Sequence, residues 1–135
     1  GGTQAGLIAG KAHYQSDIEI IGISIKDKRL EQEEKVFRLA KSSCDFIQCK
    51  SLDRKDIIVE DSYIGKGYAI PTEGMKKALK LMARKEAILL DPVYSGKAFD
   101  GLIGLVKKGY FKDSDKILFI HTGGSAAISA YEWAF

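Results

Sequence analysis

The stretch Ile88–Lys97 most constrains the fold, because it predicts a buried strand that stops abruptly and passes into a helix. Its first three residues form a continuous apolar run, which is typical of a strand covered on both faces of a parallel sheet. Pro92 ends the strand, since proline lacks a backbone N–H and fixes φ. Tyr94 then falls just beyond the carboxyl end of the strand, where open α/β sheets bind ligands. Such a tyrosine either belongs to a site or caps the core with its hydroxyl in water, and geometry alone leaves both open.

Strands and helices alternate along the rest of the chain. Apolar, largely β-branched runs predict further strands at Ile18–Ile25, Ile57–Glu60 and Lys116–His121. Helical spacing and cap residues predict helices at Gln4–Tyr14, at Lys28–Ser43, after Thr72, after Gly96 and after Ser125. Thr3 and Thr72 are the predicted N-caps of two of them. The alternation predicts an α/β fold, an open, mostly parallel twisted sheet with helices on both faces.

Size and composition narrow the class of protein further. A chain of 135 residues is expected to form a single α/β domain, residues 1–135. Its 21 basic and 18 acidic residues give a net charge of +3, too balanced to indicate a nucleic-acid partner. No apolar run approaches the roughly 20 residues of a membrane span, so no membrane partner is expected.

The cysteine usage indicates a cytoplasmic protein. Cys44 and Cys49 are the two cysteines, and they form neither a disulfide framework nor part of a metal-binding pattern. We therefore expect no metal site, and a cytoplasmic location is the default, since no signal peptide is visible. Cys44 is expected to face the core from a helix end.

Three turns fall at comparable places. Gly1-Gly2-Thr3 opens a helix, Tyr94-Ser95-Gly96 follows a strand, and His121–Gly124 follows another strand and opens a helix. In a parallel sheet these ends gather along one edge, and the N–H groups of the helix starts suit a phosphate. Each turn alone is also common without a ligand, but together they favour a cofactor that carries an anion.

Four segments resemble the motif series of the D-cysteine desulfhydrase and 1-aminocyclopropane-1-carboxylate deaminase family. They run in order along the whole chain, at Gly1–Leu7, Gly67–Gly74, Leu90–Ala98 and Phe119–Gly124. The resemblance implies a homodimeric pyridoxal 5'-phosphate enzyme with a fold of the tryptophan-synthase-β type. The chain matches most of the family's larger, cofactor-binding domain, and it begins within a glycine loop without Met. We therefore expect a fragment that lacks the N-terminal part of the protein.

The resemblance also implies which residues hold the cofactor. Gly1, Gly2 and Thr3 match the loop that binds the cofactor phosphate through N–H groups and a hydroxyl. Thr122 matches the position beside the pyridine nitrogen, where a hydroxyl leaves the ring a mild electron sink. Ser95 stands where the deaminase branch carries a carboxylate close to the ring. This difference favours β-elimination from a D-cysteine-like amino acid over opening of a cyclopropane.

Two tyrosines match the family's substrate-facing residues. Tyr94 and Tyr68 would orient a small amino-acid substrate, or move a proton if their surroundings lower the phenol pKa. Tyr68 also fits a simpler interpretation, as a loop tyrosine packing on Pro71. Asp91 is expected to be a turn acceptor and His121 a structural residue.

The expected function is that of a pyridoxal-phosphate-dependent lyase that converts D-cysteine into pyruvate, ammonia and hydrogen sulfide. No lysine here matches the family's Schiff-base lysine, and Lys97, in the first turn of a helix, is expected to be solvated. The fragment alone is therefore expected to be inactive. The alternatives are a 1-aminocyclopropane-1-carboxylate deaminase and a non-catalytic domain that binds a phosphate-bearing ligand.

Overall fold

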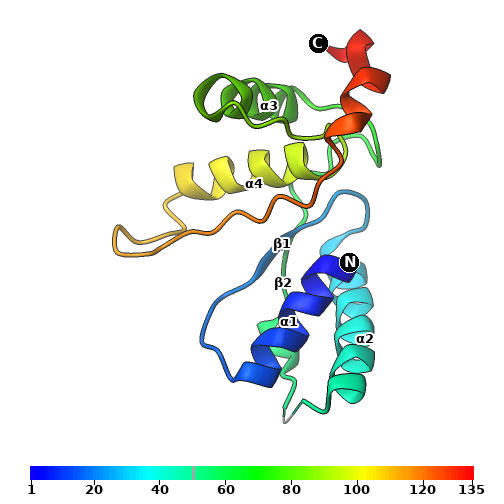
Figure 1. Ribbon diagram of the computed structural model, residues 1–135, viewed down its shortest axis with the longest axis vertical. Coiled ribbons are helices and arrows are strands. Elements are labelled where there is room, and N and C mark those ends of the chain that lie inside the picture. Colours follow the sequence, from blue (N-terminus) through cyan, green and yellow to red (C-terminus); the bar gives the residue numbers. More distant parts are fainter. Residues whose placement is uncertain (50) are drawn as a thin grey trace. The chain divides into compact units, whose positions relative to one another are not determined.

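The computed structural model describes residues 1–49 and 51–135, which fall into two units, Gly1–Asp61 and Ser62–Phe135. The first unit contains α1 (Gly2–Tyr14), β1 (Ile21–Ile23), α2 (Arg29–Ile47), the short 3₁₀ helix η1 (Arg54–Asp56) and β2 (Ile58–Glu60) (Figure 1). The second contains α3 (Glu73–Glu86), α4 (Ser95–Lys107) and the 3₁₀ segment η2 (Ser125–Ala134). The predicted order of elements is largely confirmed, and the single domain expected from length stays a prediction.

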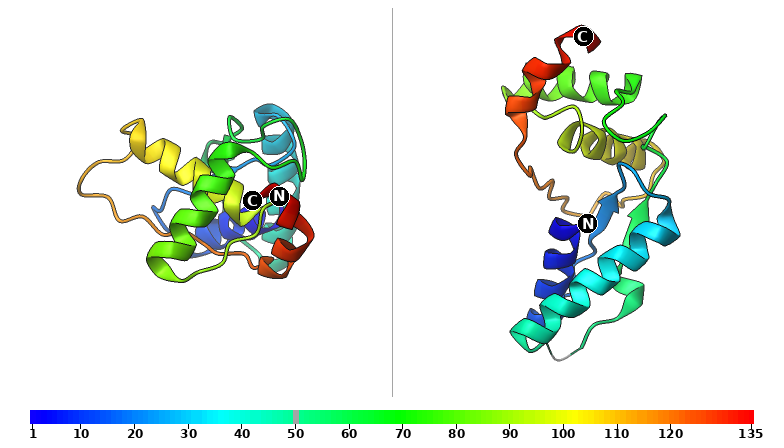
Figure 2. Two further views of the ribbon diagram at one scale, coloured as in Figure 1. Left: turned by 90° about the horizontal axis from the view of Figure 1, so that it is seen from above. Right: turned by 90° about the vertical axis from the view of Figure 1, so that its right-hand side faces the viewer.

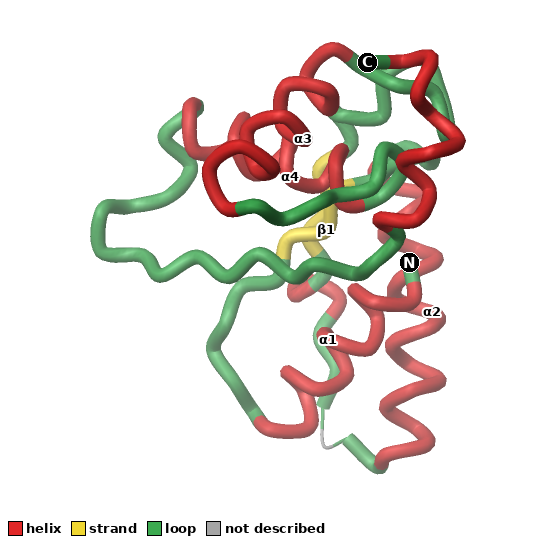
Figure 3. The backbone as a smooth tube through the Cα atoms, turned by 45° about the horizontal axis from the view of Figure 1, so that its top comes forward, coloured by secondary structure: helices red, strands yellow, loops and turns green. Residues whose placement is uncertain are grey.

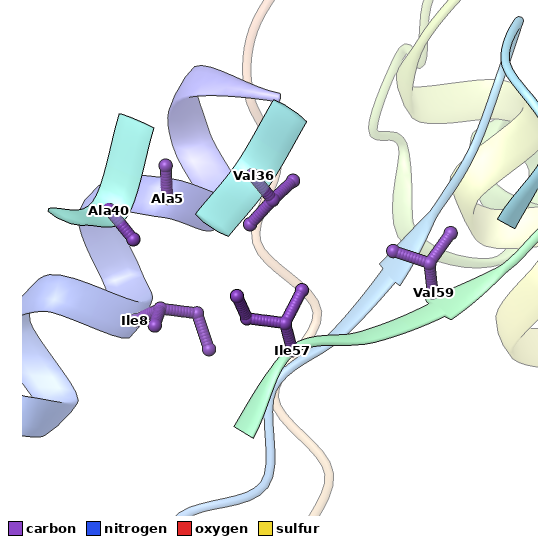
Figure 4. Close-up of a cluster of buried hydrophobic side chains, with 6 residues drawn as sticks. All are labelled: Ala5, Ile8, Val36, Ala40, Ile57 and Val59. Carbon is purple, nitrogen blue, oxygen red and sulfur yellow. The ribbon is translucent and has the colours of Figure 1, made fainter. Parts of the chain in front are cut away.

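The first unit is a β–α–β arrangement with an additional helix. β1 and β2 pair in parallel, with Gly22 opposite Val59, as the alternating pattern predicted. α1 and α2 pack together, and their apolar faces meet side chains from the region of β2 in one cluster (Figure 4). Its members are Ala5, Ile8, Val36, Ala40, Ile57 and Val59. Gln4 adds a hydrogen bond between α1 and β2, because its Nε2 donates to the Ile58 carbonyl at 2.8 Å.

The second unit is built on α3 and α4, which pack against each other (Figure 2). Met75 and Leu79 of α3 share a buried cluster with Leu90, from the apolar run that precedes α4. Residues 108–124 then run as a long segment without helix or strand (Figure 3). Phe119 of this segment packs edge-to-face on Phe99 of α4, with ring centroids 5.3 Å apart. The segment is thereby attached to α4.

Two predicted strands are wrong for this chain. Ile88–Leu90 and Lys116–His121 form no ladder with any described residue, and β1 is shorter than the predicted Ile18–Ile25. A strand needs a neighbour to accept and donate its backbone hydrogen bonds, and the described residues supply none here. Their apolar side chains are correspondingly exposed at Ile88, Leu89, Ile117, Leu118 and Ile120. The fold is α/β as predicted, mostly helical, with a small parallel sheet.

The predicted helix ends can be compared with the observed caps. Thr72 is an N-cap as predicted, since its hydroxyl accepts from Met75 N at 3.1 Å. Thr3 is not, because α1 already begins at Gly2 and the Gly1 carbonyl accepts from Ala5 N at 3.0 Å. Glycine serves adequately at an N-cap, so Thr3 lies one residue inside the helix. α2 continues to Ile47, and Cys44 faces the core near its end, as expected.

Candidate functional site

Asp91 organises the turn between the apolar run and α4. Its side chain is buried, and Oδ2 accepts from the N–H groups of Val93 and Tyr94, both at 2.8 Å. Oδ1 accepts from Ser95 N at 2.7 Å and from the Ser95 hydroxyl at 2.6 Å. The predicted role of Asp91 as a turn acceptor is confirmed, and these bonds fix the position of Tyr94.

The carboxyl of Asp91 stays ionised in this turn. Burial by itself raises its pKa, but the hydrogen bonds from the Ser95 side chain and from three backbone N–H groups outweigh burial and hold the pKa below its usual value. The Ser95 hydroxyl also accepts from Asp91 N at 2.7 Å. Ser95 is 2% exposed, so in this chain its side chain is bound to Asp91. The predicted contact of Ser95 with a cofactor stays a prediction.

The structure brings the two candidate tyrosines together. The hydroxyl oxygens of Tyr68 and Tyr94 are 2.6 Å apart, and their rings meet edge-to-face with centroids 6.1 Å apart. Both side chains remain about half exposed, at 47% and 50%. A pair of phenols that share a hydrogen bond and face outward can bind a polar ligand jointly.

Tyr94 keeps its proton at neutral pH. The hydrogen bond with Tyr68, then partial burial, and then the negative charges of Tyr68 and Asp91 in their ionised forms raise the pKa of Tyr94 above its usual value. A phenol with a raised pKa stays protonated and acts as a hydrogen-bond donor rather than as a base. The lowered pKa that a base role requires is therefore absent from Tyr94.

Tyr68 lies on a loop that is held by two side chains from elsewhere in the unit. Lys97 Nζ donates to the carbonyls of Ile64 at 2.7 Å and Gly67 at 2.9 Å. The hydroxyl of Tyr131 donates to the Ala69 carbonyl at 3.0 Å. The expectation that Lys97 is solvated is wrong, because its side chain is fully buried and burial lowers its pKa. The first turn of α4 faces the loop rather than solvent, and helical position alone did not reveal that.

The turn that contains Thr122 lies against the Asp91 turn. His121 Nδ1 accepts from Gly123 N at 2.9 Å, so its protonated Nε2 donates to the Leu89 carbonyl at 3.0 Å. A Cβ on Gly124, whose φ is +90°, would lie 3.0 Å from Asp91 Cγ, so the two turns are in close contact. The predicted gathering of these two turns is therefore observed within the second unit, with Thr122 exposed and His121 in a structural role.

Gly1, Gly2 and Thr3 form the exposed amino end of α1 in the first unit. No acidic residue stands in the first turn, and no side chain caps the helix, so its N–H groups suit an anion. Gly1 also borders a groove of about 460 Å³ whose lining includes Lys35, Arg38 and Asp27, and Lys35 is ion-paired with Asp27 at 2.8 Å. Convergence of this end with Tyr94 and Thr122 stays a prediction.

Sequence reasoning missed Lys97 and the extent of the Asp91 network. The signal for Asp91 was present, because an aspartate before a proline turn commonly accepts local N–H bonds. No local signal marked Lys97, whose partners lie 30 and 33 residues earlier. Within the described ranges, no group of three or more His, Cys, Asp or Glu side chains could hold a metal ion. Those ranges also contain no helix long and apolar enough to span a bilayer.

Comparison with known proteins adds sequence and fold relationships to this geometry. A family model described as "Pyridoxal-phosphate dependent enzyme" matches residues 1–123. D-cysteine desulfhydrases of Salmonella typhi and Salmonella newport are 42% identical over 130 residues, which cover 96% of this chain and 39% of each relative. A crystal structure described as an ACC deaminase homologue superimposes with a TM-score of 0.77 at 34% identity, covering 90% of this chain and 36% of that one. The chain thus spans about two fifths of the length of these relatives.

Proposed function

The chain belongs to the pyridoxal-phosphate dependent enzyme family, and on this premise we propose that the protein containing it is a lyase acting on D-cysteine. The proposed reaction combines D-cysteine with water and releases pyruvate, ammonia and hydrogen sulfide. It breaks the Cα–H bond and the Cβ–S bond, and the departing sulfur takes up a proton. Water then replaces the nitrogen on Cα, so the Cα–N bond breaks, ammonia leaves and the oxo group of pyruvate forms. The similarity to D-cysteine desulfhydrases supports this substrate.

The residues of this chain fit the cofactor of the family. The open first turn of α1, with two glycines and Thr3, offers N–H groups and a hydroxyl to a phosphate. The exposed Thr122 offers a neutral hydroxyl to a ring nitrogen. Pyridoxal phosphate, when bound, supplies an electron sink for the charge that develops when the substrate loses its α-proton. As the resemblance implies, Gly1, Gly2 and Thr3 are proposed as phosphate-binding residues and, separately, Thr122 as the partner of the ring nitrogen.

Tyr94 and Tyr68 are the proposed substrate-binding pair. Two phenols carry two protons, and one of these is used in the 2.6 Å bond between them. The second proton is available to the substrate carboxylate or to the departing sulfur. The raised pKa keeps Tyr94 protonated at neutral pH, so the pair is proposed to orient the substrate by donating a hydrogen bond to it.

The surroundings of Ser95 are the observation that favours this reaction over cyclopropane opening. Its hydroxyl both donates to and accepts from Asp91 in a buried turn. A carboxylate at this position would place a second negative charge beside Asp91, which burial and like charge both disfavour. The turn therefore does not suit the acidic residue that the resemblance associates with deaminases. The fold similarity to an ACC deaminase homologue keeps the deaminase as the second candidate.

The assay uses the intact protein loaded with pyridoxal phosphate. D-cysteine is expected to change the cofactor absorbance and to yield pyruvate and sulfide in equal amounts, with L-cysteine as the stereochemical control. A 2-oxo acid formed from 1-aminocyclopropane-1-carboxylate, without sulfide release from D-cysteine, would establish the deaminase instead. If the protein binds phosphate ligands but converts neither compound, the result would support the alternative of a non-catalytic domain that binds a phosphate-bearing ligand.

The remaining parts of the proposal concern assembly and location. We propose that the intact enzyme acts as a cytoplasmic homodimer on its small amino-acid substrate, as the resemblance implies. Light scattering of the intact protein after size-exclusion chromatography measures the mass of the assembly. A monomer with full activity would contradict the dimer.

A further inference from the structure

Lys97 is a buried cation to which the proposed reaction gives no role. Its side chain is 0% exposed, and the partners of its ammonium are two neutral carbonyl oxygens. Within the ranges that the structure describes, Lys97 forms no ion pair with an acidic side chain. Burying a charge without a counter-charge is unfavourable, and an apolar side chain of the same length would avoid that cost. The position therefore calls for an explanation other than packing.

The placement of Lys97 links the two phenols through the backbone. Lys97 follows Tyr94 by three residues, in the first turn of α4. One of its two carbonyl partners belongs to Gly67, the residue directly before Tyr68. A single ammonium thus connects the helix start that carries one phenol to the loop that carries the other.

The loop has few means of holding this shape by itself. Gly65 and Ala69 both have left-handed backbone angles, with φ of +70° and +58°, and alanine is strained there. The turn bond from Ile70 N to the Gly67 carbonyl is long, at 3.4 Å. Among the described residues, the short hydrogen bonds to the backbone of this loop come from Lys97 and from the Tyr131 hydroxyl. The position of Tyr68 therefore depends on Lys97.

We propose that Lys97 is a positioning residue that clamps the loop carbonyls of Ile64 and Gly67, so that the Tyr68 phenol meets the Tyr94 phenol. The clamp itself follows from the geometry of the unit. Its consequence for turnover rests on the proposed function, because only there do the two phenols contact substrate. Lys97 has no covalent role in this proposal.

The test compares Lys97→Met with Lys107→Met in the intact, cofactor-loaded protein. Methionine keeps the apolar stem and removes the donors, while Lys107 is exposed on the same helix. Three readouts apply: ultraviolet titration of the tyrosines, amide hydrogen exchange over residues 64–69, and steady-state kinetics with D-cysteine. Tyr68→Phe is the reference for loss of the contact between the phenols.

Lys97→Met is expected to lower the Tyr94 pKa in the same direction as Tyr68→Phe. Exchange of the loop amides should accelerate by about tenfold or more. A misplacement on the scale of 1 Å reduces turnover by up to about 100-fold, so kcat should fall about 10- to 100-fold with a smaller change in KM. Lys107→Met should change none of these. If Lys97→Met does not fold, Lys97→Gln takes its place, because glutamine keeps a neutral donor. It should change the Tyr94 pKa, the loop exchange and kcat in the same directions, but by smaller amounts.

The possible outcomes separate the clamp from the proposed function. A folded Lys97→Met or Lys97→Gln protein with unchanged phenol titration and loop exchange would overturn the clamp. Altered titration and exchange with unchanged kcat would overturn its role in turnover. A wild-type protein that releases no pyruvate from D-cysteine would contradict the proposed function, while titration and exchange would still decide whether Lys97 holds the loop.

Discussion

The hydroxyl oxygens of Tyr68 and Tyr94 lie 2.6 Å apart although 26 residues separate them in the chain. Tyr94 is placed by the Asp91 turn, and Tyr68 by a loop whose carbonyls bind Lys97. Both supports are buried, while the phenols are half exposed. The buried supports hold two joined phenols that keep one free O–H donor for a ligand, which is the property that the proposed lyase requires.

Replacing Tyr94 with Phe should reduce kcat for D-cysteine by about 100-fold, because the substrate loses a hydrogen bond that positions it. The cofactor should still bind, because no cofactor contact is assigned to Tyr94. Pyruvate release and cofactor absorbance measure the two effects separately. The matched control is Tyr14→Phe, at a residue that is 82% exposed in the other unit. It should change neither pyruvate release nor cofactor absorbance. Unchanged turnover in Tyr94→Phe would remove its catalytic role.

Replacing Tyr68 with Phe should lower the pKa of Tyr94, because the hydrogen bond between the phenols is the largest cause of its rise. Because the pKa of Tyr94 is higher in the folded protein than in the unfolded chain, protonated Tyr94 contributes to the free energy of unfolding. This contribution is present below the ordinary phenol pKa of about 10 and is lost as the pH rises through the folded value. Wild type and variant should therefore differ in stability at neutral pH and converge in strong alkali. Denaturation at a series of pH values tests this, and a constant difference would contradict it.

Asp91→Asn should destabilise the protein by about 2–4 kcal/mol, since a buried acceptor of several hydrogen bonds is replaced by a group that carries donors. The pKa of Asp91 is lowered in the fold, so its contribution is present above the ordinary value of about 3.9 and is lost as the pH falls through the lower, folded value. Chemical denaturation near neutrality and in acid should therefore show a difference that shrinks in acid. Asp113→Asn, at an exposed position, serves as the control.

Gly96→Ala should cost about 1–3 kcal/mol through overpacking. The added Cβ would meet the Leu79 side chain and would lie 2.6 Å from the Asp91 carbonyl oxygen, which cannot move without opening the turn. Gly10→Ala is the counterpart, because no atom lies within 4 Å of a Cβ there. In the middle of α1 this change should stabilise by about 0.5–1 kcal/mol. Thermal denaturation of both variants measures the contrast, and equal effects would contradict the described packing of Gly96.

Several parts of the fold followed from the sequence because their causes lie within a few residues. The Thr72 cap, the Asp91 turn and the inward face of α2 each depend on hydrogen bonds or spacing within one or two helical turns. The family motifs also indicated the α/β class and named both tyrosines. Short-range causes of this kind leave a pattern in the order of the residues themselves.

The tertiary structure alone decided how these local parts combine. Whether Ile88–Leu90 forms a strand depends on a neighbouring strand, which the described residues do not supply. Whether Lys97 is solvated depends on carbonyls from a loop about 30 residues earlier, and the contact between the two phenols depends on that same loop. Such contacts form only when distant segments fold together, and no periodicity or cap residue encodes them. The sequence by itself determined the elements and the candidate residues, and the folded chain determined which of those residues meet.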